Sequence, residues 1–287
     1  MMCLAIGFRG HSDMKKILVT GINSDIGEAM VQDIRQQHGE VTFYGTFRQP
    51  SAQVDRLHAC GCTLFQVDMA NQQQVEDFAR QAVQLGVDDI VFLHGSLYPI
   101  GKFGEVSFQQ WQDSQYLNAF SILHLLNALL PGLAAGSRVI SLAGGGVNGA
   151  PLNFSAYTNA KVILIKMTEL LAAEYPDLLF FNLGPGFVKT KIHVETLSAG
   201  ERAGAAFAET QRRLNEDAFV PMLKVTDALR FLLFSAPLAF SGRNFSAAHD
   251  TLSSAPFANF LAADTNAYKL RRAGNDFVAC ENPGEVK

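Results

Sequence analysis

Residues 15–27, KKILVTGINSDIG, decide the fold of this chain. The apolar run Ile17 to Thr20 predicts a buried strand, and Ile26 to Gln37 has apolar residues at helical spacing, which predicts a helix. Gly21 permits the tight turn between them, and Gly27 permits close packing of the helix on the strand. Backbone N–H groups in such a turn can hold a pyrophosphate at the helix N-terminus. Alone, this turn is weak evidence for nucleotide binding, because many strand–helix turns are rich in Gly, Asn and Ser.

Short apolar runs continue to alternate with amphipathic segments, which is typical of strand–helix units in a parallel sheet. Further strands are expected at Val41–Phe47, Thr63–Val67, Ile90–Leu93, Arg138–Ser141, Leu178–Leu183 and Asn244–Ala247. Further helices are expected at Gln72–Gln84, Phe108–Leu130, Ala156–Glu174, Glu195–Asp217 and Thr226–Phe234. We predict an α/β fold with a doubly wound, mostly parallel sheet, in one domain over residues 14–287. Residues 1–13 are expected to be a disordered tail or an upstream start.

Composition excludes several classes of protein. The 287 residues, 31.2 kDa in mass, carry 23 Lys and Arg against 27 Asp and Glu, a formal net charge of −4. Binding to a nucleic-acid backbone needs a basic excess, which is absent. Hydrophobic residues make up 48% of the chain, so disorder is not expected. No apolar stretch reaches the roughly 20 uncharged residues that span a membrane.

The four cysteines indicate a reducing compartment. Cys3, Cys60, Cys62 and Cys280 have no paired metal-ligand spacing, and a secreted disulfide framework is expected in shorter chains richer in cysteine. Cys60 and Cys62 are interpreted as buried small residues rather than half of a metal site. We therefore expect a cytoplasmic protein without a metal.

A tyrosine and a lysine form the strongest chemical signal. Tyr157 and Lys161 are four residues apart and share one face of the expected helix. A neighbouring cation favours the phenolate and lowers the tyrosine pKa toward the working range of an acid–base catalyst. Ser141 ends an apolar strand, at the sheet edge where such folds bind ligands, with Gly144 to Gly146 as a floor beside it. Ser155 is an alternative candidate for a catalytic serine, but it is expected to cap the helix instead.

These motifs resemble the short-chain dehydrogenase/reductase family, in its single-domain branch, over roughly residues 15–250. That branch carries Thr-Gly-x-x-x-Gly-x-Gly in the first turn, and this chain has Asp25 at the middle glycine. Aligned with the extended sugar-nucleotide branch, the chain has Ser24 at a glycine position instead. Asp25 is expected to cap the helix, and its carboxylate would repel a pyrophosphate mildly, which would lower cofactor affinity.

The resemblance implies roles for further residues. Ser141 would hydrogen-bond the substrate carbonyl, although its interval to Tyr157 is longer than usual in the family. Asn118 stands seven residues after Trp111, as in the family, where the asparagine holds a backbone irregularity and a water that relays protons to the lysine. The implied catalytic residues are Ser141, Tyr157, Lys161 and Asn118. The implied cofactor contacts are Gly21, Asn23, Ser24, Asp25, Ile26, Gly27, Arg48, Asp68, His94, Gly95, Tyr157, Lys161, Pro185, Gly186, Val188 and Thr190.

The second strand indicates the cofactor. An acidic residue there would accept from the ribose 2′-hydroxyl of NAD, whereas a cation favours NADP. The strand ends in Phe47 and Arg48 without an acid, so we predict NADP rather than NAD, with Arg48 against the 2′-phosphate. Asp68 matches the family position that contacts adenine. His94 stands where the family has Asn, and it either supports the sheet edge or reaches the cofactor ribose.

The expected function is NADP-dependent hydride transfer between nicotinamide and a carbonyl or alcohol substrate, with Tyr157 as acid/base. A catalytically silent NADP-binding regulatory protein and a nucleotide-sugar epimerase or dehydratase remain as alternatives. Residues 241–250 and 268–272 faintly resemble relatives associated with surface polysaccharides, which suggests a sugar-linked substrate. The expected partners are a small-molecule substrate and a second copy of the chain, in a homodimer or homotetramer through the apolar faces of 121–130 and 162–171. A buried core could account for the same faces. Apolar pocket residues are expected among Tyr98, Phe103, Phe154, Phe187 and Ile192.

Overall fold

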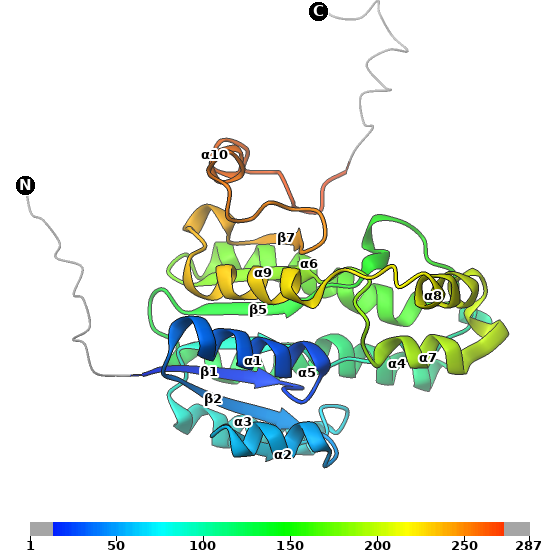
Figure 1. The fold of residues 1–287 in the computed structure, drawn as a ribbon, viewed down its shortest axis with the longest axis horizontal. Coiled ribbons are helices and arrows are strands. Elements are labelled where there is room, and N and C mark those ends of the chain that lie inside the picture. Colours follow the sequence, from blue (N-terminus) through cyan, green and yellow to red (C-terminus); the bar gives the residue numbers. More distant parts are fainter. Residues whose placement is uncertain (1–13, 273–287) are drawn as a thin grey trace, which may run out of the picture.

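The computed structural model describes residues 14–272 (Figure 1), and the expectations for residues 1–13, Cys3 and Cys280 lie outside that range. Within this range, seven strands form one sheet in the order β3-β2-β1-β4-β5-β6-β7. Every neighbouring pair of strands is parallel. The strands are β1 (Lys15–Thr20), β2 (Val41–Phe47), β3 (Thr63–Gln66), β4 (Asp89–Phe92), β5 (Arg138–Leu142), β6 (Leu179–Gly184) and β7 (Arg243–Ser246). The predicted doubly wound α/β fold is confirmed.

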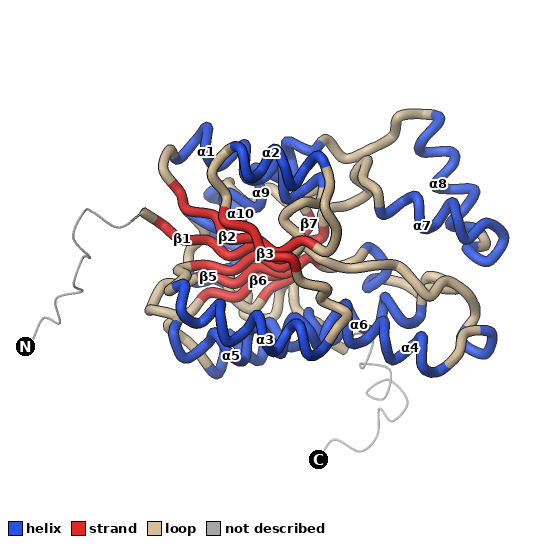
Figure 2. The backbone as a smooth tube through the Cα atoms, turned by 90° about the horizontal axis from the view of Figure 1, so that it is seen from below, coloured by secondary structure: helices blue, strands red, loops and turns tan. Residues whose placement is uncertain are grey.

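Helices cover both faces of the sheet, as Figure 2 shows. The helices on one face are α1 (Asp25–His38), α2 (Ala52–Ala59), α9 (Met222–Phe234) and α10 (Ala255–Ala263). The helices on the other face are α3 (Gln72–Ala82), α4 (Phe108–Gln115), α5 (Ser121–Leu129) and α6 (Ser155–Glu174). Two more, α7 (Ile192–Ala199) and α8 (Ala205–Asn215), lie beyond the carboxyl ends of the strands. We call residues 189–217, which contain α7 and α8, the lid segment.

The core has two layers because successive strand residues point to opposite faces. In β1, Ile17 and Val19 pack in one apolar cluster with α1 and α9, whereas Leu18 packs in the other with α3 and α5. All three are fully buried. The sheet is thus covered on both sides, as expected for parallel strands. Strand order reverses between β1 and β4, which opens a crevice at their carboxyl ends.

Several elements differ from the sequence prediction. The expected helix over residues 108–130 is interrupted by a π-helical turn, Tyr116–Phe120. The segment 195–217 divides into α7 and α8 at Gly200 and Gly204, both of which have positive φ. Helices α2 and α10 were not predicted, because each is short and is flanked by turn residues that mask its helical pattern.

The cysteines also differ from expectation. Cys62 is buried, as predicted, but Cys60 is exposed at the C-terminal end of α2. Both thiols are free. Within residues 14–272, no group of three or more His, Cys, Asp or Glu side chains is placed to hold a metal ion. Over the same residues, no helix has the length and apolar character needed to cross a membrane.

Candidate active site

A cavity of about 470 Å³ lies at the carboxyl edge of the sheet, where the strand order reverses. Its walls come from the loops after β1 to β6, from α6 and α7, and from Leu117 of the π-helical turn. Many of the residues expected from the sequence line it: Gly21, Asn23, Ser24, Asp25, Ile26, Arg48, Asp68, His94, Gly95, Tyr157, Lys161, Pro185 and Thr190. Gly27, Asn118, Ser141, Gly186 and Val188 are not among the lining residues.

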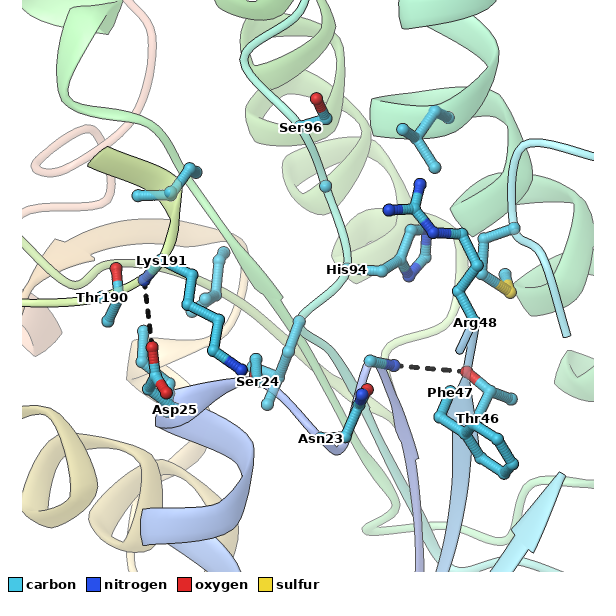
Figure 3. Close-up of a pocket in the computed structure, with 18 of the residues that line it drawn as sticks. Asn23, Ser24, Asp25, Thr46, Phe47, Arg48, His94, Ser96, Thr190 and Lys191 are labelled. Carbon is cyan, nitrogen blue, oxygen red and sulfur yellow. Dashed lines mark hydrogen bonds between the residues drawn. The ribbon is translucent and has the colours of Figure 1, made fainter. Parts of the chain in front are cut away.

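Steric contacts explain why two positions of the first loop are glycines. Gly21 has φ of 67°, and a Cβ on it would lie 3.0 Å from the His94 backbone. A Cβ on Gly27 would lie 2.3 Å from the carbonyl oxygen of Ile22, so Gly27 supports the turn from behind. Thr46 on β2 accepts a 3.2 Å hydrogen bond from the Gly21 amide (Figure 3). The loop is therefore held open toward the cavity by residues without side chains.

Asp25 does not cap α1, contrary to expectation. Ser24 is the N-cap, and its Oγ accepts a 3.1 Å hydrogen bond from the Gly27 amide. The Asp25 carboxylate instead accepts from the Lys191 backbone amide at 3.0 Å (Figure 3) and from Gln53 Nε2 at 3.2 Å. Asp25 therefore joins the first helix to α2 and to the lid segment.

The loops after β2 and β3 bring two expected cofactor contacts to the cavity wall. Arg48 follows β2 directly and is exposed along the cavity (Figure 3). Asp68 follows β3, and its Oδ1 accepts from the Ala70 amide at 3.0 Å. Arg48 and Asp68 therefore lie at the β2–β3 end of the cavity, away from the loops after β5 and β6.

His94 supports the edge of the sheet. Its Nδ1 lies 2.6 Å from Thr20 Oγ1, and its Nε2 lies 3.0 Å from Ser121 Oγ. Burial lowers the pKa of His94 to about 3, and the Lys161 ammonium adds to this shift. The neutral ring therefore joins β1, β4 and α5, and both of its nitrogens are engaged.

Tyr157 and Lys161 lie together on α6. Lys161 Nζ is 5.5 Å from the centroid of the Tyr157 ring. Burial lowers the pKa of Lys161 to about 8. Burial also raises the pKa of Tyr157 to about 12, and the Glu195 carboxylate contributes. The sequence predicted a lowered tyrosine pKa, whereas in the structure burial and the Glu195 carboxylate raise it.

Asn118 holds the loop that follows β4. It is fully buried within the π-helical turn, which is the expected backbone irregularity. Its Oδ1 accepts from the Ser96 amide at 3.0 Å, and its Nδ2 donates to the Ser96 carbonyl at 2.9 Å. A Cβ on Gly95 would lie 2.8 Å from Asn118 Oδ1 and 3.8 Å from Lys161 Nζ. Gly95 thus lets Asn118 and Lys161 approach the same loop.

Ser141 does not reach the cavity, contrary to expectation. Its Oγ is buried and donates a 2.5 Å hydrogen bond to Asn182 Oδ1 on β6. Asn182 in turn donates to Thr168 and to the Leu164 carbonyl on α6. Strand alternation gives the reason: Ser141 points with Val139 toward the α6 layer. The predicted grouping of Ser141 with Tyr157 is therefore corrected.

Gly144 lies against the tyrosine instead. A Cβ at Gly144 would stand 2.6 Å from Tyr157 Cε1 and 3.1 Å from its hydroxyl oxygen. The long interval between Ser141 and Tyr157 was the sequence signal for this error. Ser155 does not cap α6 either, because the helix begins at Ser155 and has no side-chain cap.

The loop after β6 leads into the lid segment. Gly186 has φ of 78°, and a Cβ on it would lie 2.7 Å from Val220 Cγ2, so this glycine serves packing. Val188 is buried in the core. Pro185 and Thr190 line the cavity, as expected for the family's Pro-Gly loop.

Sequence reasoning missed Glu195 on α7. Its carboxylate accepts from Ser96 Oγ at 3.1 and 3.0 Å and from the Leu97 amide at 2.6 Å. Burial raises the pKa of Glu195, whereas the hydrogen bonds from Leu97 and Ser96 oppose that rise. No motif marks this residue, because its partners are about 98 positions away in the chain.

Comparison with known proteins agrees with this arrangement. The family model described as short chain dehydrogenase matches residues 15–200. An uncharacterized oxidoreductase of Saccharomyces cerevisiae, YIR035C, is 25% identical over 185 residues, which are 63% of this chain and 73% of that protein. Its crystal structure superposes with a TM-score of 0.72 at 21% identity, covering 86% of this chain and 99% of that one.

Two further proteins are similar. A benzil reductase of Saccharomyces cerevisiae that forms (S)-benzoin is 27% identical over 192 residues, 62% of this chain and 73% of that protein. A crystal structure of an actinorhodin polyketide ketoreductase with NADPH has a TM-score of 0.70 at 16% identity, covering 86% of this chain and 98% of that one. At this identity the structural likeness concerns the fold alone.

Proposed function

Because this chain belongs to the short-chain dehydrogenase family, we propose that it transfers a hydride between NADP and a carbonyl or alcohol substrate, with Tyr157 as the proton donor and acceptor. The observation that carries the proposal is the pairing of Tyr157 with buried Lys161 in a cavity at the carboxyl edge of the sheet. This is where open parallel sheets bind dinucleotides.

The residues of the cavity fit a nicotinamide cofactor. Gly21 and Gly95 keep the wall open where a Cβ would collide, and the N-terminus of α1 faces the same space. Asn23, Ser24 and Ile26 would contact the pyrophosphate, and Pro185, Thr190 and the loop around Gly186 and Val188 would face the nicotinamide. Asp68 would lie at the adenine and Arg48 at the 2′-phosphate, which favours NADP over NAD.

The chain's own residues then supply the proton chemistry. The bound cofactor supplies or accepts the hydride. Tyr157 holds its proton near neutral pH because burial raises its pKa to about 12, so it can donate to a substrate oxygen. Lys161, an ammonium below its pKa of about 8, would hold the ribose and stabilise negative charge on the phenol oxygen.

The cofactor and Tyr157 roles are tested together. Titration with NADPH and NADH, followed by cofactor fluorescence, is expected to give tighter binding of NADPH. An aromatic diketone such as benzil, the compound named for one relative, is the first substrate to try. Tyr157→Phe removes the transferable proton, so we expect turnover to fall by about 100-fold or more while the dissociation constant for NADPH stays within about twofold. Retained turnover in Tyr157→Phe would contradict the assignment.

A catalytically silent NADP-binding protein is the second candidate function. Gly144 favours it, because no side-chain hydroxyl from the end of β5 stands beside Tyr157 to polarise a carbonyl. NADPH binding without oxidation across a broad panel of carbonyl compounds would support this candidate over the first.

We also propose a homodimer. On α5, Ile122, Leu125 and Leu126 are buried within the chain itself, so that the core accounts for part of the expected face. Phe120 and Leu170 remain 47% and 42% exposed on the outer side of the α4–α5 and α6 layer, where a second copy could cover them. Cytoplasmic location stays a prediction from the sequence.

A further inference from the structure

One end of the cavity is built from three segments that carry almost no charge. They are residues 96–101 after β4 and residues 143–154 after β5, which line the cavity through Ser96 and Ala143, and α7, which lines it through Ile192 and Glu195. The first two contain no Lys, Arg, Asp or Glu. In α7 the only formally charged residue is Glu195. The Tyr157 side chain lies at this end, which we call the substrate end.

Glu195 is fixed in place at the substrate end. Three hydrogen bonds from Ser96 Oγ and the Leu97 amide hold its carboxylate against the loop after β4. The Asn118 side chain in turn holds the Ser96 backbone, through hydrogen bonds with its amide and its carbonyl oxygen. The carboxylate therefore cannot swing away from a bound molecule without breaking contacts that also hold the loop.

The cations that lie nearest to this carboxylate in the cavity are assigned to the cofactor. The Arg48 guanidinium opposes the rise in the pKa of Glu195, and in the proposed function it would hold the 2′-phosphate. Lys161, beside Tyr157, would hold the ribose.

His193, two residues before Glu195 on α7, stacks on Phe187 and turns Nε2 to the Val188 carbonyl at 2.7 Å. Lys191 Nζ donates to Gln53 Oε1, at the α1–α2 side of the cavity. The donors to Glu195 are neutral groups, so they orient its charge without cancelling it.

We propose that Glu195 determines substrate specificity by excluding anions: the substrate end takes uncharged carbonyl compounds and rejects those with a carboxylate or phosphate beside the carbonyl. This inference rests on the proposed hydride transfer. A second negative charge placed within several ångströms of Glu195 would be repelled strongly in a partly desolvated site. It would also lose water without gaining a cation as partner.

A matched pair of compounds tests the proposal. Benzoylformate and its methyl ester share one ketone and differ in one negative charge. For the wild-type enzyme loaded with NADPH we expect both kcat/KM and the binding constant from calorimetry to favour the ester. In Glu195→Gln, which keeps an oxygen to accept from Leu97, we expect the ester-to-acid ratio to fall by about tenfold or more.

Two further variants separate charge from structure. Glu201→Gln removes the same charge from an exposed site on the lid segment and is expected to leave the ratio unchanged. Ser96→Ala removes two of the hydrogen bonds to Glu195 but keeps its charge, so the preference for the ester should persist.

The outcomes distinguish this inference from the proposed function. An unchanged ratio in Glu195→Gln, equal binding of acid and ester by the wild type, or binding of neither compound would overturn the role of Glu195. Selective binding of the ester without turnover would support Glu195 as the selective residue and overturn the proposed hydride transfer instead.

Discussion

Gly144 acts through the side chain that it lacks. Its Cα lies so close to the Tyr157 ring that a Cβ would approach to 2.6 Å, a distance that forces one of the two to move. Gly144 is therefore a positioning residue for the phenol, whose oxygen must stand at a fixed place to exchange a proton with substrate.

Substitution at Gly144 tests this role. Gly144→Ala is expected to push the Tyr157 ring away and to lower kcat by about 10- to 100-fold, because small misplacements of reacting groups are costly. Gly149→Ala is the matched control, since a Cβ there meets no atom within 4 Å. Stopped-flow oxidation of NADPH measures both variants. Wild-type kcat in Gly144→Ala would rule out the positioning role.

Under the proposed function, we expect Lys161 to give the reaction its dependence on pH. Its pKa of about 8 lies below the ordinary 10.5, so the ammonium is present below pH 8 and is lost as pH rises through 8. Tyr157, with a pKa of about 12, stays protonated over this range. We expect kcat/KM for carbonyl reduction to be level below pH 8 and to fall about tenfold per pH unit above it. Lys161→Arg should move that fall to much higher pH, and a profile unchanged in this variant would assign the titration to another group.

The lowered pKa of Lys161 also makes the stability of the fold depend on pH. Stability is expected to rise over the pH range in which activity falls. Because the unfolded chain keeps the lysine proton up to about pH 10.5 and the folded chain loses it near 8, the folded state binds fewer protons between these values. The stability cost of burying the ammonium is therefore present below pH 8 and is relieved as pH rises from 8 toward 10.5.

At the scale of elements, β7 and α10 are joined by one arginine. Arg243 is buried and donates to the backbone carbonyls of Ala239, Leu261 and Asp264 at 2.7 to 2.9 Å. The Leu261 and Asp264 carbonyls belong to the C-terminal end of α10, and the Ala239 carbonyl belongs to the turn before β7. The guanidinium thus replaces the backbone partners that an irregular segment lacks.

Removing this guanidinium is expected to loosen the C-terminal segment. Arg243→Met leaves buried carbonyls without donors and should lower the free energy of unfolding by about 3 kcal/mol in urea titrations. Arg271→Met is the control, because the ion pair of Arg271 with Glu169 lies nearer the surface and should contribute less than about 1 kcal/mol. Equal losses in the two variants would contradict the role of Arg243.

Elements were predictable to the extent that they carry a clear period. The strands and the helices α1, α3, α6 and α9 follow from apolar spacing. The π-helical turn around Asn118 was expected only from the family resemblance, as a backbone irregularity. Apolar spacing could not predict it, because it depends on hydrogen bonds from that side chain to Ser96, which is far away in sequence. The break between α7 and α8 could have been predicted from Gly200 and Gly204, which favour positive φ.

For the whole molecule, the sheet was predictable and the site only in part. Alternation of apolar runs and helices determines a parallel sheet, and its carboxyl edge collects the loops. The presence of Tyr157, Lys161 and Gly21 in the site could be predicted, because each belongs to a motif of residues that are close in the sequence. Ser141 was misplaced because strand alternation turns it inward, and Glu195 was missed because only tertiary structure brings α7 to the loop after β4.

Asp25 has a consequence for the timing of catalysis. Its carboxylate accepts hydrogen bonds from the Lys191 amide and the Gln53 side chain, so it connects the N-terminus of α1 to the lid segment and to α2. A dinucleotide that enters or leaves past the lid segment would break the hydrogen bond between Asp25 and the Lys191 amide. This hydrogen bond would then slow both the entry and the release of the cofactor.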